Sequence, residues 1–155
     1  LAHEIQKQLR DEEDDPIYEQ RARVDQVLQF FELDFEKYSG YFDDLPRVEK
    51  LRTEYVNCVN AIEFQNELLA QLVDELLELR RQLREKVPLE AKKDVIIKLA
   101  HTKLDIGDRK NKRFFKEKER RSLLDLLSPI IADVKMQRLL AEQERAKLDA
   151  EALAE

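Results

Sequence analysis

Residues 47–86 read RVEKLRTEYVNCVNAIEFQNELLAQLVDELLELRRQLREK, a run of 40 residues with neither glycine nor proline. With Val48 at position a of a heptad, ten of the twelve a and d positions hold an apolar residue or cysteine, and Gln65 interrupts the run. This regularity predicts one helix of ~60 Å at 1.5 Å per residue, with a coiled-coil-like seam for packing or oligomerisation. The seam residues are Val48, Leu51, Tyr55, Cys58, Ile62, Leu69, Leu72, Leu76, Leu79 and Leu83.

Val59, Leu68 and Val73 occupy e and g positions beside this seam. They widen the apolar stripe, and a wide stripe contacts two partner helices rather than one. We therefore expect an all-α protein. Its predicted form is an elongated antiparallel helical bundle with coiled-coil character, in which a long central helix is flanked by shorter helices.

Glycine and proline mark the ends of the other helices, because glycine suits a helix C-cap and proline suits the first helical turn. A helix is expected over 16–39, between an N-cap at Asp15 and a C-cap at Gly40. The turn YFDDLP at 41–46 then leads into the long helix, with Asp44 as its N-cap.

Downstream, Pro88 is expected to stop the long helix, and Gly107 to end a shorter helix over 89–106. Ser128 and Pro129 are expected to start a final helix, with the serine as its cap. These breaks divide the chain into several helices connected by short turns.

Helix lengths predict how these segments pack. The 16–39 helix should lie antiparallel along the first half of the long helix, and the 89–106 helix along its second half. Val95, Ile96 and Leu99 are expected to fill the second of these interfaces.

Three regions follow from this organisation. Residues 1–15 form a short helix and an acidic spacer, DEEDD at 11–15. Residues 16–106 form a helical bundle built on the 47–86 helix. Residues 107–155 form a basic collar followed by C-terminal helices that extend the bundle.

Composition limits the possible classes of protein. The chain has 155 residues, of which 40% are charged and 43% hydrophobic, and no apolar run approaches the roughly 20 residues that cross a bilayer. The single cysteine excludes an internal disulfide framework and indicates a reducing compartment. We therefore expect a cytoplasmic protein, with cytoskeletal association or the nucleus as alternatives. The sequence starts with neither an initiator methionine nor an apolar signal core and ends inside a helical pattern, so we expect a piece of a longer protein.

The net charge of −6 is unevenly distributed. Residues 1–45 carry 5 basic and 13 acidic groups, whereas residues 107–121 carry 8 basic and 3 acidic groups. Within the second range, RKNKRFFKEKERR at 109–121 interleaves cations with two phenylalanines. This basic collar is the candidate partner-binding segment. Its candidate residues are Arg109, Lys110, Lys112, Arg113, Phe114, Phe115, Lys116, Arg120 and Arg121.

The collar has several interpretations. Cations with aromatic rings can bind nucleic acid by phosphate contact and base stacking. They can equally bind an acidic protein surface, or enter calmodulin as a basic amphipathic helix. The simplest interpretation is a solvated helix face with Phe114 and Phe115 turned towards the core and Glu117 paired with Arg121.

Catalytic and metal-binding patterns are missing from the sequence. The two histidines, His3 and His101, are far apart, and His101 has no glutamate or cysteine at metal-ligand spacing. The DEEDD run lacks the glycine and the spaced ligands of a calcium loop. We expect neither an enzyme nor a bound cofactor.

The sequence favours a structural or scaffolding segment of a larger intracellular assembly, of cytoskeletal, ciliary or tethering type. Its expected partners are other helical proteins, in a homodimer or in a hetero-assembly. A regulated adaptor that binds a small GTPase, a motor or a peptide helix is one alternative, and nucleic-acid binding through 109–121 is a second. Oligomeric state would distinguish a scaffold from an adaptor.

Overall fold

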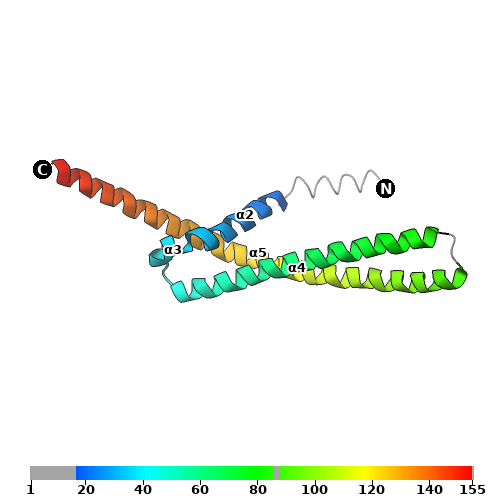
Figure 1. Cartoon of the computed structure of the whole chain (residues 1–155). Helices are drawn as coiled ribbons and strands as arrows, with labels where there is room; N and C mark the ends of the chain where they lie inside the picture. The colour runs from blue at the N-terminus through cyan, green and yellow to red at the C-terminus, as the bar shows by residue number, and fades with distance from the viewer. Residues whose placement is uncertain (1–16, 86–87, 155) are drawn as a thin grey trace, which may run out of the picture. The chain divides into compact units, whose positions relative to one another are not determined.

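The computed structural model describes residues 17–85 and 88–154, in which every regular element is a helix (Figure 1). The all-α prediction is confirmed. The predicted short helix at 1–10, the DEEDD spacer and the Asp15 cap lie outside the described residues. The elements are α2 (Ile17–Gln29), the π-helical turn η1 (Phe30–Asp34), α3 (Phe35–Tyr38), the 3-10 turn η2 (Ser39–Tyr41), α4 (Leu45–Arg84) and α5 (Leu89–Ala154).

The predicted long helix corresponds to α4, and its start follows the expected signal. The amide of Arg47 donates to Oδ1 of Asp44 at 3.2 Å, and the amide of Val48 donates to the Asp44 carbonyl at 3.1 Å. Asp44 is thus the N-cap, and Pro46 lies in the first turn, where a helix needs no N–H donor. The helix ends before Pro88, as predicted.

Helix α5 corrects two predictions. Gly107 does not end a helix, and Pro129 with Ser128 does not start one, because both positions lie inside the 66-residue α5. No described glycine has a positive φ, so neither Gly107 nor Gly40 forms a left-handed cap. An interior glycine costs about 1 kcal/mol and a proline about 3 kcal/mol. Burial of the neighbouring Ile106 and Leu127 offsets these costs.

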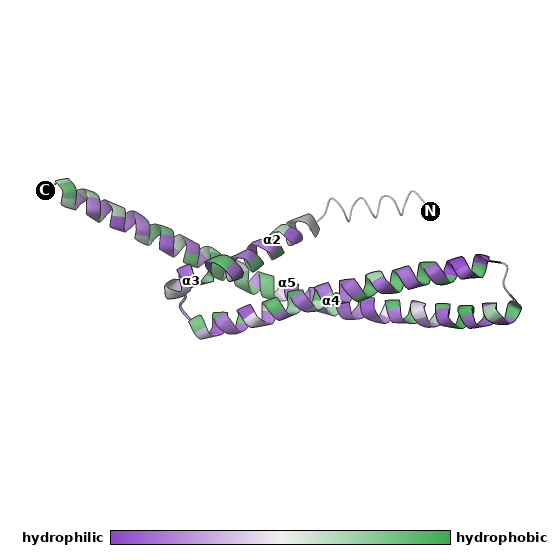
Figure 2. Ribbon diagram, in the orientation of Figure 1, coloured by the Kyte–Doolittle hydropathy of each residue, from purple (hydrophilic) through white to green (hydrophobic). Residues whose placement is uncertain are grey.

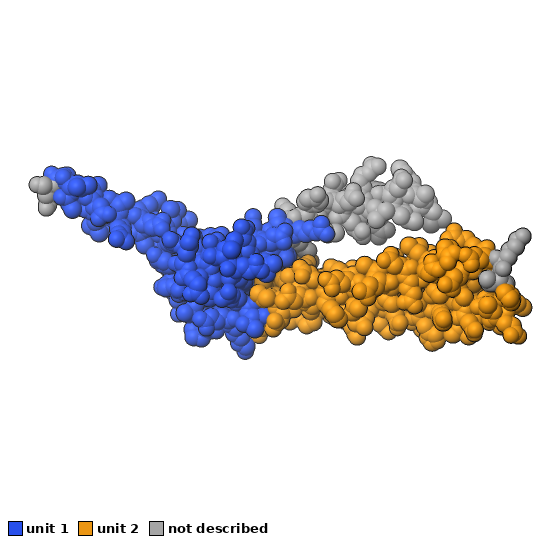
Figure 3. All heavy atoms as spheres, in the orientation of Figure 1, with its two compact units in different colours: residues 1–53, 122–155 blue, residues 54–121 orange. Residues whose placement is uncertain are grey.

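The chain divides into two compact units, coloured separately in Figure 3. The hairpin unit is Glu54–Arg121, and the aromatic unit combines Leu1–Thr53 with Ser122–Glu155.

In the hairpin unit, α4 and α5 lie side by side and antiparallel, so α5 folds back along α4 as the sequence predicted (Figure 1). Figure 2 shows that apolar and polar residues alternate along both helices. Val95 and Leu99 are half-buried, but Ile96 is 53% exposed, so its predicted place in the interface is wrong. The buried side chains of this unit are Tyr55, Cys58, Val59, Ile62, Leu69, Leu79, Thr102, Ile106.

In the aromatic unit, the predicted 16–39 helix contains a π turn. Phe30 and Phe31, at the start of this turn, are each only 1% exposed. They follow the buried Val27 by three and four residues and therefore lie on the same face of the helix. Phe30 contributes to the core of the unit. Its ring lies 5.4 Å from that of Tyr38, and Phe35 lies 5.4 Å from Phe42. A cluster of aromatic rings therefore forms the centre of this unit.

Polar contacts tie the segments of the aromatic unit together. Arg52 of α4 donates to the Phe31 carbonyl at 2.7 Å, and its guanidinium lies 4.5 Å from the centre of the Phe35 ring. Arg23 of α2 donates to Asp125 and to the Ser128 hydroxyl of α5, each at 3.3 Å. Residues 16–39 therefore contact α5 as well as α4, which the predicted pairing did not include.

Candidate protein-docking surface

The predicted seam on α4 lies mostly inside the protein. Tyr55, the most enclosed of its residues, has no exposed surface, and Cys58 is 2% exposed. The intermediate positions Leu72, Leu76 and Leu83 are half-buried. The remaining seam residues, all buried, are Val48, Leu51, Ile62, Leu69 and Leu79. The seam is thus covered by the chain's own segments, and its use in oligomerisation stays a prediction.

Cys58 is enclosed in the hairpin unit. Its thiol donates to the Lys116 carbonyl of α5, with the sulfur 3.0 Å from the oxygen. Burial raises the pKa of the Cys58 thiol, and the negative charge of Glu119 raises it further. A buried, protonated thiol is a packing residue rather than a nucleophile.

The basic collar lies on α5 in the hairpin unit, and its phenylalanines point outwards. Phe114 is 51% exposed and Phe115 is 67% exposed, so the prediction that they turn towards the core is wrong. Their ring centres are 6.0 Å apart at an interplanar angle of 64°. The ammonium group of Lys118 lies 4.8 Å from the centre of the Phe114 ring.

The collar cations have two different roles. Arg113 holds α5 to α4, because its Nη1 donates to Oδ1 of Asn66 at 3.0 Å. It also pairs with Glu117 at 3.5 Å, in place of the predicted pair between Glu117 and Arg121. Lys116 pairs with Glu119 at 3.0 Å, which raises the pKa of the lysine. The collar cations that form no ion pair within the described residues are Arg109, Lys110, Lys112, Lys118, Arg120 and Arg121.

A second apolar stripe runs along α5 and extends into the collar. We call it the outer stripe, and its positions are separated alternately by three and four residues. Of its large side chains, Ile97 is 56% exposed and Leu104 is 66% exposed. A Cβ atom added at Gly107 would meet no other atom within 4 Å. The outer stripe consists of Ile97, Ala100, Leu104, Gly107, Asn111 and Phe114.

The outer stripe faces away from α4. The buried positions of α5 in this unit include Thr102 and Ile106, with Leu99 half-buried. At about 100° per residue, Leu104 lies about 200° around the helix from Thr102. The hairpin therefore leaves unpaired the apolar face of α5 that is directed away from α4.

The sequence predicts Ile96 in the interface with the long helix, whereas the structure exposes it next to Ile97 of the outer stripe. The heptad spacing of Ile97, Leu104 and Asn111 could have indicated a second face. The small or polar residues between them weaken that signal, and only packing of α5 on α4 separates one stripe from the other.

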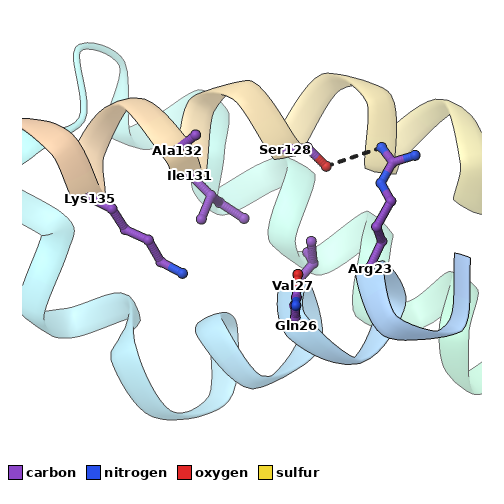
Figure 4. A pocket seen from close by; sticks show the side chains of 7 residues that line it. All are labelled: Arg23, Gln26, Val27, Ser128, Ile131, Ala132 and Lys135. Atoms are coloured by element: carbon purple, nitrogen blue, oxygen red, sulfur yellow. Dashed lines mark hydrogen bonds between the residues drawn. The ribbon is translucent and has the colours of Figure 1, made fainter. Parts of the chain in front are cut away.

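The described residues offer no catalytic constellation. His101 is exposed on α5, and no group of three or more His, Cys, Asp or Glu in the described ranges could hold a metal ion. A hollow of about 210 Å³ in the aromatic unit is lined partly by Arg23, Ser128 and Lys135 (Figure 4). This hollow is smaller than the roughly 300 Å³ at which ligand pockets begin. A larger hollow of about 460 Å³ beside Lys37, Tyr38 and Arg138 is shallow and mostly polar.

None of the described helices, α5 included, carries an apolar stretch that would reach across a lipid bilayer. The surface with the clearest capacity to bind is therefore the outer stripe with the adjacent collar. Comparisons of the chain with known protein families, with curated proteins and with solved structures found no match.

Proposed function

We propose that the chain is a non-catalytic structural segment of a larger intracellular assembly, and that it acts by docking helices of other protein chains. The docking surface is the outer stripe of α5 together with the basic collar. Apolar side chains of the stripe supply the contact area, and the collar selects for acidic partners.

One observation carries this proposal. Ile97, Leu104 and Phe114 are each more than half exposed, at coiled-coil spacing, on the face of α5 opposite its packed face. Burying each such side chain would contribute about 1.5–3 kcal/mol. An aligned series of exposed apolar residues is typical of an interaction surface, whereas scattered ones are not.

Nucleic-acid binding is the second candidate, because Phe114 and Phe115 are exposed among cations. Three contacts favour a protein partner instead. Lys118 lies over the Phe114 ring, where a base would have to stack. Arg113 and Lys116 are already paired with acidic side chains of α5.

Site-specific photo-crosslinking tests the proposal. A photoreactive amino acid replaces Leu104 in the full chain, expressed in cells of the source organism. A matched control carries it at Phe64 of α4, which is 55% exposed in the same unit but is not on the stripe. We expect protein crosslinks from position 104 that are much stronger than those from position 64. Equal crosslinking from both positions, or crosslinks mainly to nucleic acid, would contradict the proposal.

A further inference from the structure

The C-terminal part of α5 carries a second unpaired apolar stripe, which we call the tail stripe. Met136 is 54% exposed, Leu139 is 48% exposed and Leu153 is 88% exposed. From residue 141 to 154 every side chain of α5 is exposed. The tail stripe, again spaced alternately by three and four, consists of Met136, Leu139, Gln143, Ala146, Ala150 and Leu153.

A helical segment without a packed face is marginally stable in water, because most helix stability in proteins comes from tertiary packing. A partner helix along the tail stripe would therefore stabilise this end of α5. Both stripes contain small residues, Ala100 and Gly107 in one and Ala146 and Ala150 in the other. Small side chains at these positions allow two helix axes to approach closely.

The two stripes fit each other in an antiparallel pair. If Ile97 faces Leu153 of a second copy, the alternating spacing brings every later position of one stripe opposite a position of the other. Two of the resulting layers are mixed, Gly107 with Gln143 and Asn111 with Leu139. The other layers are Ile97 with Leu153, Ala100 with Ala150, Leu104 with Ala146 and Phe114 with Met136.

Charges beside the stripes agree with this register. In antiparallel coiled coils the g positions of the two helices face one another. Lys103 then faces Asp149 of the second copy. Lys110 faces Glu142, a carboxylate that also pairs with Arg138 of its own helix at 3.0 Å.

Other registers bring like charges together. A shift of one heptad in one direction places Lys110 opposite Lys135, and a shift in the other direction places Glu117 opposite Glu142. A parallel pair that aligns Ile97 with Met136 places Lys103 beside Lys147 of the second copy. Like charges at such positions select against an alignment.

We propose that the outer stripe of α5 receives the tail stripe of a second copy in this antiparallel register, so that the chain self-associates through α5. The inference rests on the proposed function, since it names the partner of the same docking surface. Its occupant is this chain itself rather than another acidic helix.

A charge-swap experiment on the purified full chain tests the inference by sedimentation. The Lys103→Glu, Lys110→Glu variant should weaken self-association by about tenfold, the scale of losing two surface ion pairs and gaining repulsion. Glu142→Lys, Asp149→Lys should weaken it similarly. The variant with all four substitutions should regain self-association, because the reversed charges beside the outer stripe of one copy then face reversed charges beside the tail stripe of the other.

The matched control is Lys93→Glu, Lys98→Glu, which makes the same charge change on α5 outside the collar and outside the g positions, and it should weaken self-association far less than the variant at 103 and 110. A Leu104→Cys, Ala146→Cys variant provides a second measurement. Mild oxidation should link copies through these cysteines, which face each other in the proposed register.

A chain that stays monomeric at about 100 µM, well above the Kd of an ordinary specific complex, would overturn the inference. Failure of the fourfold variant to regain association would overturn it too. Strong crosslinks from position 104 to other proteins, with a monomeric purified chain, would leave the proposed function standing. Crosslinking from position 104 that is no stronger than from position 64 would contradict both the proposed function and the self-association.

Discussion

Single residues connect the two helices of the hairpin unit. Cys58 and Arg113 each connect α4 to α5, one through the Lys116 carbonyl and the other through Asn66. Gln65 is half-buried and its Oε1 has no hydrogen-bond partner. Such a group costs stability, and a polar residue within a seam can restrict its register.

At this scale, Cys58 predicts a pH dependence. Because burial raises its pKa in the folded state, the folded protein keeps the thiol proton to higher pH than the unfolded chain does. This contribution is fully present below a pH of about 8.5, the ordinary cysteine pKa, and is lost as pH rises further. The free energy of unfolding, measured in urea at neutral and at alkaline pH, should therefore fall less with pH for Cys58→Ala than for the native chain. Equal losses in both proteins would contradict the assignment.

Among the elements, α5 is the one whose continuity depends most on its neighbours. It contains a glycine and a proline in its interior, and Gly107 has open space around the position of a Cβ atom. A side chain there would therefore meet no obstacle within the chain, and the residue only weakens the helix.

We therefore expect Gly107→Ala to raise the free energy of unfolding by about 1 kcal/mol, the helix-propensity difference between the two residues. The reciprocal change Ala100→Gly, also on the outer stripe, should lower it by a similar amount. Thermal and urea unfolding at two protein concentrations would separate this effect from self-association. A destabilised Gly107→Ala protein would show that α5 bends or packs differently at this position.

Across the whole molecule, the two units differ in charge. The hairpin unit, Glu54–Arg121, carries 16 basic and 13 acidic residues, a net charge of +3. The other unit, Leu1–Thr53 with Ser122–Glu155, carries 12 basic and 21 acidic residues, a net charge of −9. Opposite charge on the two units favours contact between unlike units of different copies.

This asymmetry predicts how salt acts on self-association. The Debye length falls from about 10 Å at 0.1 M salt to about 3 Å at 1 M. Raising the salt concentration should therefore weaken association several-fold through the exposed ion pairs, while the apolar layers preserve part of it. Sedimentation at low and high salt measures the change. Stronger association at high salt would indicate an apolar contact in which the lysine–carboxylate pairs do not form.

The candidate surface was only half predictable. The sequence alone located the collar, because a cluster of eight cations within 15 residues does not depend on how the chain folds. Its phenylalanines were assigned to the wrong side, and Ile96 was assigned to the packed interface. Both errors have one source: α5 has apolar residues on two faces, and only contact with α4 decides which face is covered.

The sequence by itself determined that the chain is helical, where α4 begins and where it gives way to α5. These features depend on neighbouring residues, such as the Asp44 cap and the heptad run of 47–86. The tertiary structure alone decided that α5 continues through Gly107 and Pro129 and that Phe30 turns inwards. A glycine or proline inside a helix costs only about 1–3 kcal/mol of helix stability. The burial of several side chains that are distant in the sequence contributes more than this.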